Sequence, residues 1–157
     1  MAEQTPRTAR GHEEPFAVHF SVFIANRVGQ LKDLLNLLGN NAVGVLGLTI
    51  VDSTDWGVVR IITSDPGKTR ELLKAHHLPF TEGQVILAEQ ASANSLAEIC
   101  GVLLLAEINV QFVYPLTIRR NDNPILAIHV DDQVLAVRTL AKHGFTLLGH
   151  EDLGEPA

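Results

Sequence analysis

The sequence contains a single cysteine, Cys100, among its 157 residues. One cysteine cannot form a disulfide within the chain, and it excludes zinc or iron–sulfur sites that need several cysteines. No apolar run approaches the roughly 18 residues of a membrane-spanning helix. The first residues also lack the apolar stretch of a secretory signal. These absences predict a cytoplasmic protein without membrane attachment.

Charge of either sign is scarce. Charged residues make up 19% of the chain and the net charge is −6, and Arg119–Arg120 is the one adjacent basic pair. A nucleic-acid or anionic-membrane surface needs clustered Lys and Arg. Aromatic residues make up 5%, too few for the stacking surface of an RNA-recognition module. With 46% hydrophobic residues, the chain can form a core, and its low charge favours an apolar contact between subunits in a homo-oligomer.

The first half of the chain alternates strand and helix patterns. Residues 16–25 place apolar side chains at every second position, which is typical of a strand. The next segment, 29–39, has leucines at helical spacing. Strand patterns follow at 43–52 and 58–63, then a helix at 64–77 with Ser64 or Asp65 as its N-cap and Pro66 at its first position. A short strand at 78–82 completes the order βαββαβ.

The second half repeats this order. A strand is expected at 84–90, a helix near 95–107, strands at 108–116 and 125–130, a helix capped by Asp131 or Asp132, and a closing strand. Equivalent residues lie 65 apart in the early part and 67 apart later, which indicates a duplication with one short insertion in a hairpin. The matching pairs are Leu31/Leu96, Leu35/Cys100, Gly44/Asn109, Ile61/Ile128, Leu73/Leu140 and His76/His143.

The repeat predicts the domain organisation and the fold class. We expect a tail at 1–15, one domain at 16–82, a second at 83–153, and a short tail at 154–157. Each βαββαβ unit predicts an α+β, ferredoxin-like domain with helices on one face of an antiparallel sheet, and the two sheets are expected side by side. In the first helix of the second unit, we expect five residues to face inward: Leu96, Ile99, Cys100, Leu103 and Leu104.

Two segments carry a resemblance to a known family. The loop "NRVGQL" at 26–31 follows a strand and precedes a leucine-striped helix, and "AEINVQFVYP" at 106–115 contains an alternating strand. Together they resemble the ACT domain, so the chain is similar to a tandem ACT protein over 16–153. Val28 stands where the family usually has proline, and the second loop, "SANS" at 92–95, has lost the Pro-Gly pair.

The resemblance implies a small-molecule-binding regulatory protein, with an amino acid as the ligand and a metabolic enzyme as a possible partner. It implies one composite ligand site at the interface of the repeats, built from the loop and from the second-strand asparagine of the other repeat. Where serine-binding members have a histidine, this chain has Ile24. The site around Asn94–Ser95 and Gly44 is expected to be silent or altered. The expected ligand-binding residues are Asn26, Arg27, Val28, Gly29, Gln30 and Asn109.

Each site residue also has a structural interpretation. Asn26 is as well suited to cap the following helix, and Gly29 serves chain geometry as readily as ligand approach. Arg27 is either solvated or in contact with a carboxylate. Asn109, at the start of a strand, needs a hydrogen-bond partner that is either backbone or ligand.

No residue pattern indicates catalysis, so we expect a protein that is not an enzyme, with no cofactor and no metal. An acylphosphatase-like enzyme would need an anion-binding loop beside an arginine, and the sequence has none. The remaining alternative is an ACT dimer with a structural or interaction role, whose ligand sites have decayed.

Overall fold

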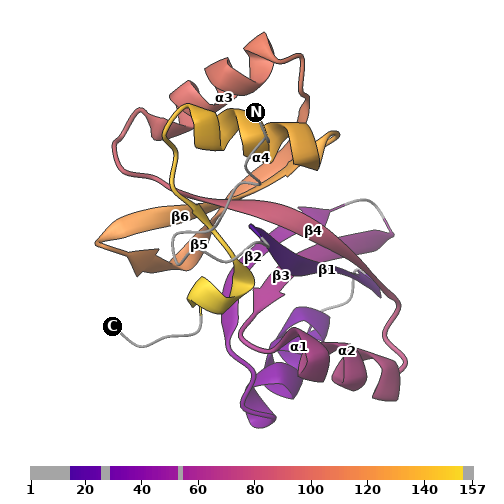
Figure 1. The fold of residues 1–157 in the computed structure, drawn as a ribbon. Helices are drawn as coiled ribbons and strands as arrows, with labels where there is room; N and C mark the ends of the chain where they lie inside the picture. Colours follow the sequence, from indigo (N-terminus) through magenta and orange to yellow (C-terminus); the bar gives the residue numbers. More distant parts are fainter. Residues whose placement is uncertain (1–14, 26–28, 53–54, 154–157) are drawn as a thin grey trace. The chain divides into compact units, whose positions relative to one another are not determined.

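The computed structural model describes residues 15–25, 29–52 and 55–153. Within them, four α-helices and seven strands follow one another in the order βαββαβαββαβ, one strand fewer than two complete βαββαβ units, and a short 3₁₀ helix follows the last strand (Figure 1). The elements are β1 (Phe16–Ala25), α1 (Gln30–Asn40), β2 (Val45–Asp52), β3 (Trp56–Thr63), α2 (Pro66–Ala75), β4 (Phe80–Glu89), α3 (Ser95–Leu105), β5 (Val110–Arg120), β6 (Asn123–Val130), α4 (Gln133–Lys142), β7 (Leu147–Leu148) and η1 (His150–Leu153).

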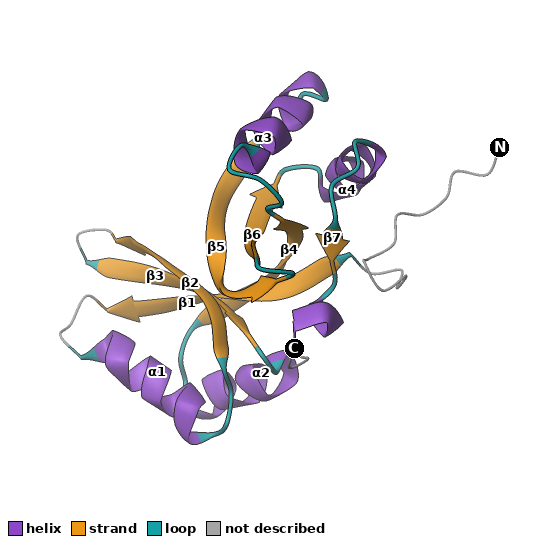
Figure 2. Cartoon of the chain, turned by 90° about the vertical axis from the view of Figure 1, so that its left-hand side faces the viewer, coloured by secondary structure: helices purple, strands orange, loops and turns teal. Residues whose placement is uncertain are grey.

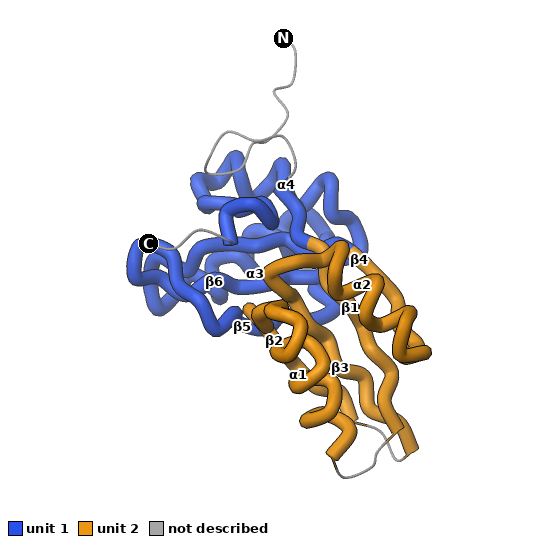
Figure 3. Tube along the Cα trace, turned by 90° about the horizontal axis from the view of Figure 1, so that it is seen from below, with its two compact units in different colours: residues 1–17, 84–157 blue, residues 18–83 orange. Residues whose placement is uncertain are grey.

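The chain divides into two compact units. One consists of Val18–Gly83, and the other combines residues 1–17 with 84–157 (Figure 3). The sequence predicts two strands at this boundary, 78–82 and 84–90, and that prediction is wrong. A single strand, β4, runs through the boundary from Phe80 to Glu89, because Gly83 continues the extended chain instead of turning it.

Gly83 has a packing reason to be glycine. The ring of His19, which is 5% exposed, lies against its Cα. A Cβ added at Gly83 would come within 2.6 Å of His19 Nε2. A side chain at this position of β4 would therefore force the buried ring to move.

In the unit Val18–Gly83, strand β3 pairs antiparallel with β1 on one side and with β2 on the other. Ile61 of β3 lies opposite Phe20 of β1 and Leu48 of β2. Helices α1 and α2 cover the same face of these strands (Figure 2). The alternating strand residues and the leucine stripe of α1 meet there in one apolar core. Its buried members are Phe20, Val22, Leu34, Leu38, Val43, Val59, Ile61 and Leu73.

The other unit repeats the arrangement. Strand β6 pairs antiparallel with β5 and β4, and β4 pairs antiparallel with the short β7. Helices α3 and α4 lie together on one side of these strands (Figure 1). The α+β class, the antiparallel pairing and the four helices are therefore confirmed. The buried core consists of Ile86, Ala88, Ile99, Leu103, Ile108, Leu126, Ile128, Val130, Ala136, Val137, Leu140 and Leu147.

Helix α3 faces the core differently from the prediction. Cys100 is exposed and Leu104 is 75% exposed, whereas both were expected to face inward. The buried residues are Ser95, Ile99 and Leu103, which recur every four positions. Nearly every residue of α3 is apolar or small, so its sequence does not mark one face clearly.

The duplication extends to the helix starts. Asp65 caps α2 by accepting a hydrogen bond from Lys68 N at 3.0 Å, and Asp132 caps α4 by accepting one from Leu135 N at 3.1 Å. The sequence offers two cap candidates at each helix, Ser64 or Asp65 for α2 and Asp131 or Asp132 for α4. The second candidate is the cap in both helices. These caps satisfy N–H groups that the first turn of a helix leaves unpaired.

Candidate functional site

The loop that was expected to hold a ligand is described in part. Asn26, Arg27 and Val28 lie outside the described residues. Gly29 precedes α1 as its N-cap with φ of 92°, and its carbonyl oxygen accepts a hydrogen bond from Asp33 N at 2.9 Å. A positive φ is costly for any residue with a Cβ. Chain geometry alone therefore accounts for glycine at this position.

Asn109 has a definite hydrogen-bond partner within its own unit. It is exposed, and its Nδ2 donates to Asp131 Oδ2 at 3.1 Å while its backbone N–H donates to Asp131 Oδ1 at 3.1 Å. In return, Asp131 N donates to the Asn109 carbonyl oxygen at 3.2 Å. Two of these bonds hold the Asn109 backbone and one orients its side chain, which leaves Oδ1 and one amide hydrogen for a further contact.

The carboxyl of Asp131 is ionised more readily than usual. Desolvation alone would raise its pKa, but hydrogen bonds from the Asn109 side chain and from backbone N–H groups outweigh it, so the pKa of Asp131 is lowered. A carboxylate that accepts several N–H bonds is stabilised in its charged form. The pair therefore places a negative charge beside Asn109 at neutral pH.

The other repeat keeps the backbone half of this link. Gly44 N donates to Ser64 Oγ at 2.8 Å, and Ser64 N donates to the Gly44 carbonyl oxygen at 2.9 Å. Gly44 and Ser64 are the repeat equivalents of Asn109 and Asp131, so the asparagine and the charge are features of one repeat. In the sequence, Asp131 stands out only as one of two adjacent aspartates, Asp131 and Asp132, either of which can cap the following helix.

A hollow of about 430 Å³ lies beside α1, within the unit Val18–Gly83. We call it the α1 hollow. It combines apolar side chains with amides, one carboxylate and one imidazole. Gln30, one of the predicted ligand-binding residues, lies at its edge in the first turn of α1. The lining residues are Ile24, Gln30, Asp33, Leu34, Asn36, Leu37, Asn40, His76 and Leu78.

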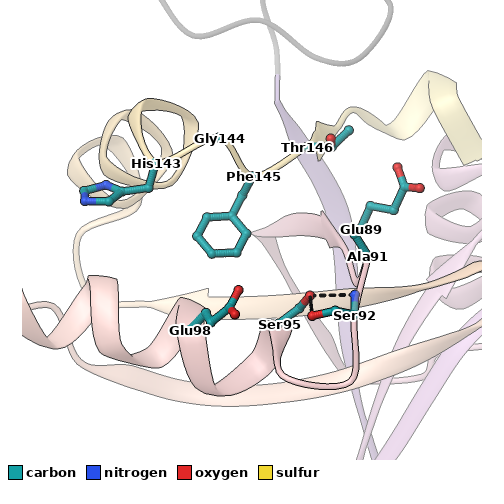
Figure 4. A pocket seen from close by; sticks show the side chains of 9 residues that line it. All are labelled: Glu89, Ala91, Ser92, Ser95, Glu98, His143, Gly144, Phe145 and Thr146. Carbon is teal, nitrogen blue, oxygen red and sulfur yellow. Dashed lines mark hydrogen bonds between the residues drawn. The ribbon is translucent and has the colours of Figure 1, made fainter.

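A second hollow, of about 220 Å³, lies beside α3 in the other unit. We call it the α3 hollow. Figure 4 shows the ring of Phe145 between the start of α3 and the end of α4, with the carboxylates of Glu89 and Glu98 on the same hollow. The lining residues are Glu89, Ala91, Ser92, Ser95, Glu98, His143, Gly144, Phe145 and Thr146.

The two hollows occupy the same place in the two repeats. Each is formed by the end of a strand, the first turn of the following helix, and the segment that follows the second helix. The equivalent lining residues are Ile24/Glu89, Gln30/Ser95, Asp33/Glu98, His76/His143 and Leu78/Phe145. No local sequence pattern singles out Glu89, Glu98 and Phe145, although the offsets of the duplication align them with Ile24, Asp33 and Leu78.

Ser92 and Ser95 give the α3 hollow a rigid polar floor. Ser92 N donates to Ser95 Oγ at 3.0 Å, and the two hydroxyl oxygens are 3.3 Å apart (Figure 4). Asn94 precedes the helix without a side-chain cap bond. The loop "SANS" has thus lost the family glycine and gained a hydroxyl turn that holds the first turn of α3.

His143 is held from outside the hollow. Its Nδ1 lies 2.8 Å from the Thr139 carbonyl oxygen, so this nitrogen carries the hydrogen. Across the described residues, no group of three or more His, Cys, Asp or Glu side chains is arranged to hold a metal ion. The lining residues of both hollows offer hydrogen bonds, charge and apolar contact.

The expected composite site includes residues of both units. Gly29 and Gln30 belong to the unit Val18–Gly83, and Asn109 belongs to the other. Their assembly into one ligand site stays a prediction. In the part of the chain that the structure describes, no helix has the length and apolarity needed to cross a membrane.

Comparison with known proteins gives a family match over most of the chain. A family model described as an ACT domain pair matches residues 17–154. The fold is similar to that of protein BT0572 from Bacteroides thetaiotaomicron, with a TM-score of 0.81 and 23% identity over 90% of this chain and 97% of the other. No curated protein matches the chain significantly.

A second solved structure has a more distant likeness. The regulatory subunit of aspartate kinase from Thermus thermophilus matches with a TM-score of 0.57 and 10% identity, over 81% of this chain and 91% of the other. Identities this low establish a shared fold and nothing finer. The family match, by contrast, covers both repeats and the strands and loops that line both hollows.

Proposed function

Because the chain belongs to the family of ACT domain pairs, we propose that it is a regulatory protein that binds a small molecule, an amino acid in the first instance. The observation that carries this proposal is the family match across residues 17–154. A ligand that contacts two regulatory domains changes the free energy of their arrangement, and such coupling can alter the activity of a partner. The chain itself is proposed to have no catalytic activity.

We propose the predicted residues as the ligand site: Asn26, Arg27, Val28, Gly29 and Gln30 from one repeat and Asn109 from the other. The structure supports a role for Asn109 because its Nδ2 donates to Asp131 Oδ2, a bond that orients the side-chain amide and leaves Oδ1 to accept a bond from a ligand ammonium. The charge on Asp131 favours the same ammonium group. The helix that begins after Gly29 offers N–H groups to a carboxylate.

Titration calorimetry of the full chain against the twenty amino acids tests this proposal. We expect at least one amino acid to bind, and Asn109→Ala to weaken it strongly. Asn94→Ala, in the loop of the second repeat that corresponds to residues 26–31 of the first, should leave binding unchanged. If no amino acid binds, or if both variants lose binding equally, the proposed site is wrong.

A partner enzyme is the second part of the proposal. One protein with a similar fold is described as the regulatory subunit of aspartate kinase from Thermus thermophilus. We propose that this chain modulates a metabolic enzyme. Affinity capture with and without the bound amino acid, followed by an activity assay of the captured enzyme, would test it. A ligand that changes neither capture nor activity would contradict it.

The alternative function, an interaction protein that forms homodimers, is supported by exposed apolar residues on α3 and α4. Leu104 is 75% exposed and Leu105 is 84% exposed, and Val134 of α4 is 60% exposed. At the equivalent positions of the other repeat the chain has Gly39, Asn40 and Gly67. One repeat thus has an apolar outer helix surface where its duplicate has none, as expected for a contact between subunits.

Light scattering after gel filtration tests the homodimer. We expect the wild type to be dimeric, and Leu104→Ser combined with Leu105→Asn to be monomeric with an unchanged circular dichroism spectrum. Lys32→Ser on the outer side of α1 is the control and should stay dimeric. A monomeric wild type, or a dimer in both variants, would contradict the proposed surface.

A further inference from the structure

The α3 hollow is more acidic and more aromatic than the α1 hollow. Two apolar residues of the α1 hollow, Ile24 and Leu78, are replaced in the α3 hollow by Glu89 and Phe145. The acidic residue of the helix's first turn is present in both, as Asp33 and Glu98. The α3 hollow therefore has one more carboxylate and one more aromatic ring than its duplicate.

Glu89 is the unusual member of this set. It ends β4 and is 8% exposed, although a carboxylate is among the groups that rarely lie buried. Its Oε1 accepts a bond from Asn123 Nδ2 at 2.8 Å, which is a neutral donor. Burying a charge is costly unless an opposite charge accompanies it, and the duplicate avoids this cost with isoleucine.

The described residues that line the hollow include no permanently positive side chain. Neither lysine nor arginine is among the nine lining residues. Glu98 reaches the hollow from the first turn of α3, where the helix dipole stabilises it. Two carboxylates without a basic neighbour in the hollow create a negative potential that attracts a cation.

Phe145 adds a second and independent attraction. Phe145 lines the hollow, and its ring lies between α3 and the end of α4 (Figure 4). The face of an aromatic ring attracts an ammonium or guanidinium group at close range. The hollow's volume of about 220 Å³ corresponds to roughly seven water molecules at about 30 Å³ each, enough for the charged end of an aliphatic amine.

From these observations we propose that the α3 hollow binds a small organic cation that has a primary ammonium or guanidinium group. Glu89 and Glu98 bind the cationic group, the ring of Phe145 covers it, and the hydroxyls of Ser92 and Ser95 accept its remaining N–H bonds. This site deepens the proposed ligand-binding function by naming a ligand class for a hollow that lies wholly in one unit. The α1 hollow, with Ile24 and Leu78 in the matching places, does not bind this class.

The test uses the full chain and two cationic probes, putrescine and agmatine, with butanediol as the neutral analogue. Titration calorimetry at low salt should give saturable binding of the cations with a Kd below about 10 mM, and no binding of butanediol. Glu89→Gln, which keeps an oxygen for Asn123, and Glu98→Gln should each raise the Kd roughly 10- to 100-fold. Phe145→Leu, the residue of the duplicate, should raise it several-fold.

Asp33→Asn in the α1 hollow is the matched control, and it should leave the Kd unchanged. Glu98 is exposed, so Glu98→Gln keeps the test decisive even if Glu89→Gln folds poorly. The proposal is overturned if the cations do not saturate, if butanediol binds as well, or if Asp33→Asn weakens binding as much as Glu98→Gln. Amino-acid binding that depends on Asn109 while cations do not bind would overturn this inference and leave the proposed function standing.

Discussion

Replacing Gly83 by alanine should destabilise the protein, although alanine is normally the better residue inside a strand. The new Cβ would lie 2.6 Å from His19 Nε2 and 3.2 Å from its Cδ2, and the ring is buried. Overpacking of this kind costs about 1–3 kcal/mol, while the glycine-to-alanine exchange returns about 0.5–1 kcal/mol. The difference is a net loss of up to about 2.5 kcal/mol, which lowers Tm by up to roughly 10 °C in a chain of this size.

Thermal unfolding followed by circular dichroism measures this change. Gly57→Ala in β3 is the matched control, because its Cβ would meet Ile24 Cγ1 at 3.5 Å, an ordinary contact. Gly57→Ala should therefore leave Tm unchanged or slightly higher. The double variant Gly83→Ala/His19→Ser should be more stable than the sum of its single changes predicts. A Gly83→Ala protein as stable as Gly57→Ala would refute the packing of His19 against β4.

Three further changes test the helix starts and the polar link. Gly29→Ala, at φ of 92°, should cost about 1–2 kcal/mol in urea unfolding, whereas Gly39→Ala, which meets open space in α1, should gain about 0.5–1 kcal/mol; equal effects would contradict the left-handed backbone. Asp132→Ala should cost about 0.5–2 kcal/mol through the lost cap of α4, and a neutral result in the same assay would argue against that cap. Asn109→Ala should destabilise the protein at neutral pH, and the loss of stability should become smaller as the pH falls. The lowered pKa of Asp131 stabilises the fold above the unfolded-state pKa, and this contribution is lost as the carboxyl is protonated. If the difference in unfolding free energy between wild type and variant stays constant from pH 7 downward, the proposed bonds are excluded.

Much of the fold follows from local signals in the sequence. Pro66 after Asp65 marks the start of α2, and the strand at 16–25 is where alternation predicts it. The repeat offsets of 65 and 67 predict two copies of one element order, and the structure follows this order except that the single strand β4 stands where two strands were predicted. These signals work because caps and periodicity act between neighbours in the chain.

The failures arise where local signals are balanced or absent. Helix α3 is apolar on most sides, so its sequence does not choose between burying Cys100 and burying Ile99. A glycine such as Gly83 is typical of a boundary between domains. Here it lies inside one continuous strand, where the absence of a side chain lets His19 approach closely. In both cases, packing against residues far away in the sequence decides the outcome.

The candidate site was predictable in part. The structure supports a structural reason for Gly29 through its positive φ, and it supplies the partner that Asn109 needed, the carboxylate of Asp131. The α3 hollow could not be predicted from local sequence, because Glu89 and Phe145 are 56 residues apart and meet only when the segment after α4 packs beside the end of β4. Glu89 N and Thr146 O, which are 3.0 Å apart, make that connection.

Thermal stability of the full chain in the presence of each of the twenty amino acids tests the central claim most directly. A ligand at about 100 times its Kd stabilises the folded state by about 2.7 kcal/mol, which raises Tm by roughly 5–10 °C in a chain of this size. The proposed regulatory function predicts such a rise for at least one amino acid, and its loss in Asn109→Ala. A Tm that no amino acid changes would contradict it and favour the interaction protein.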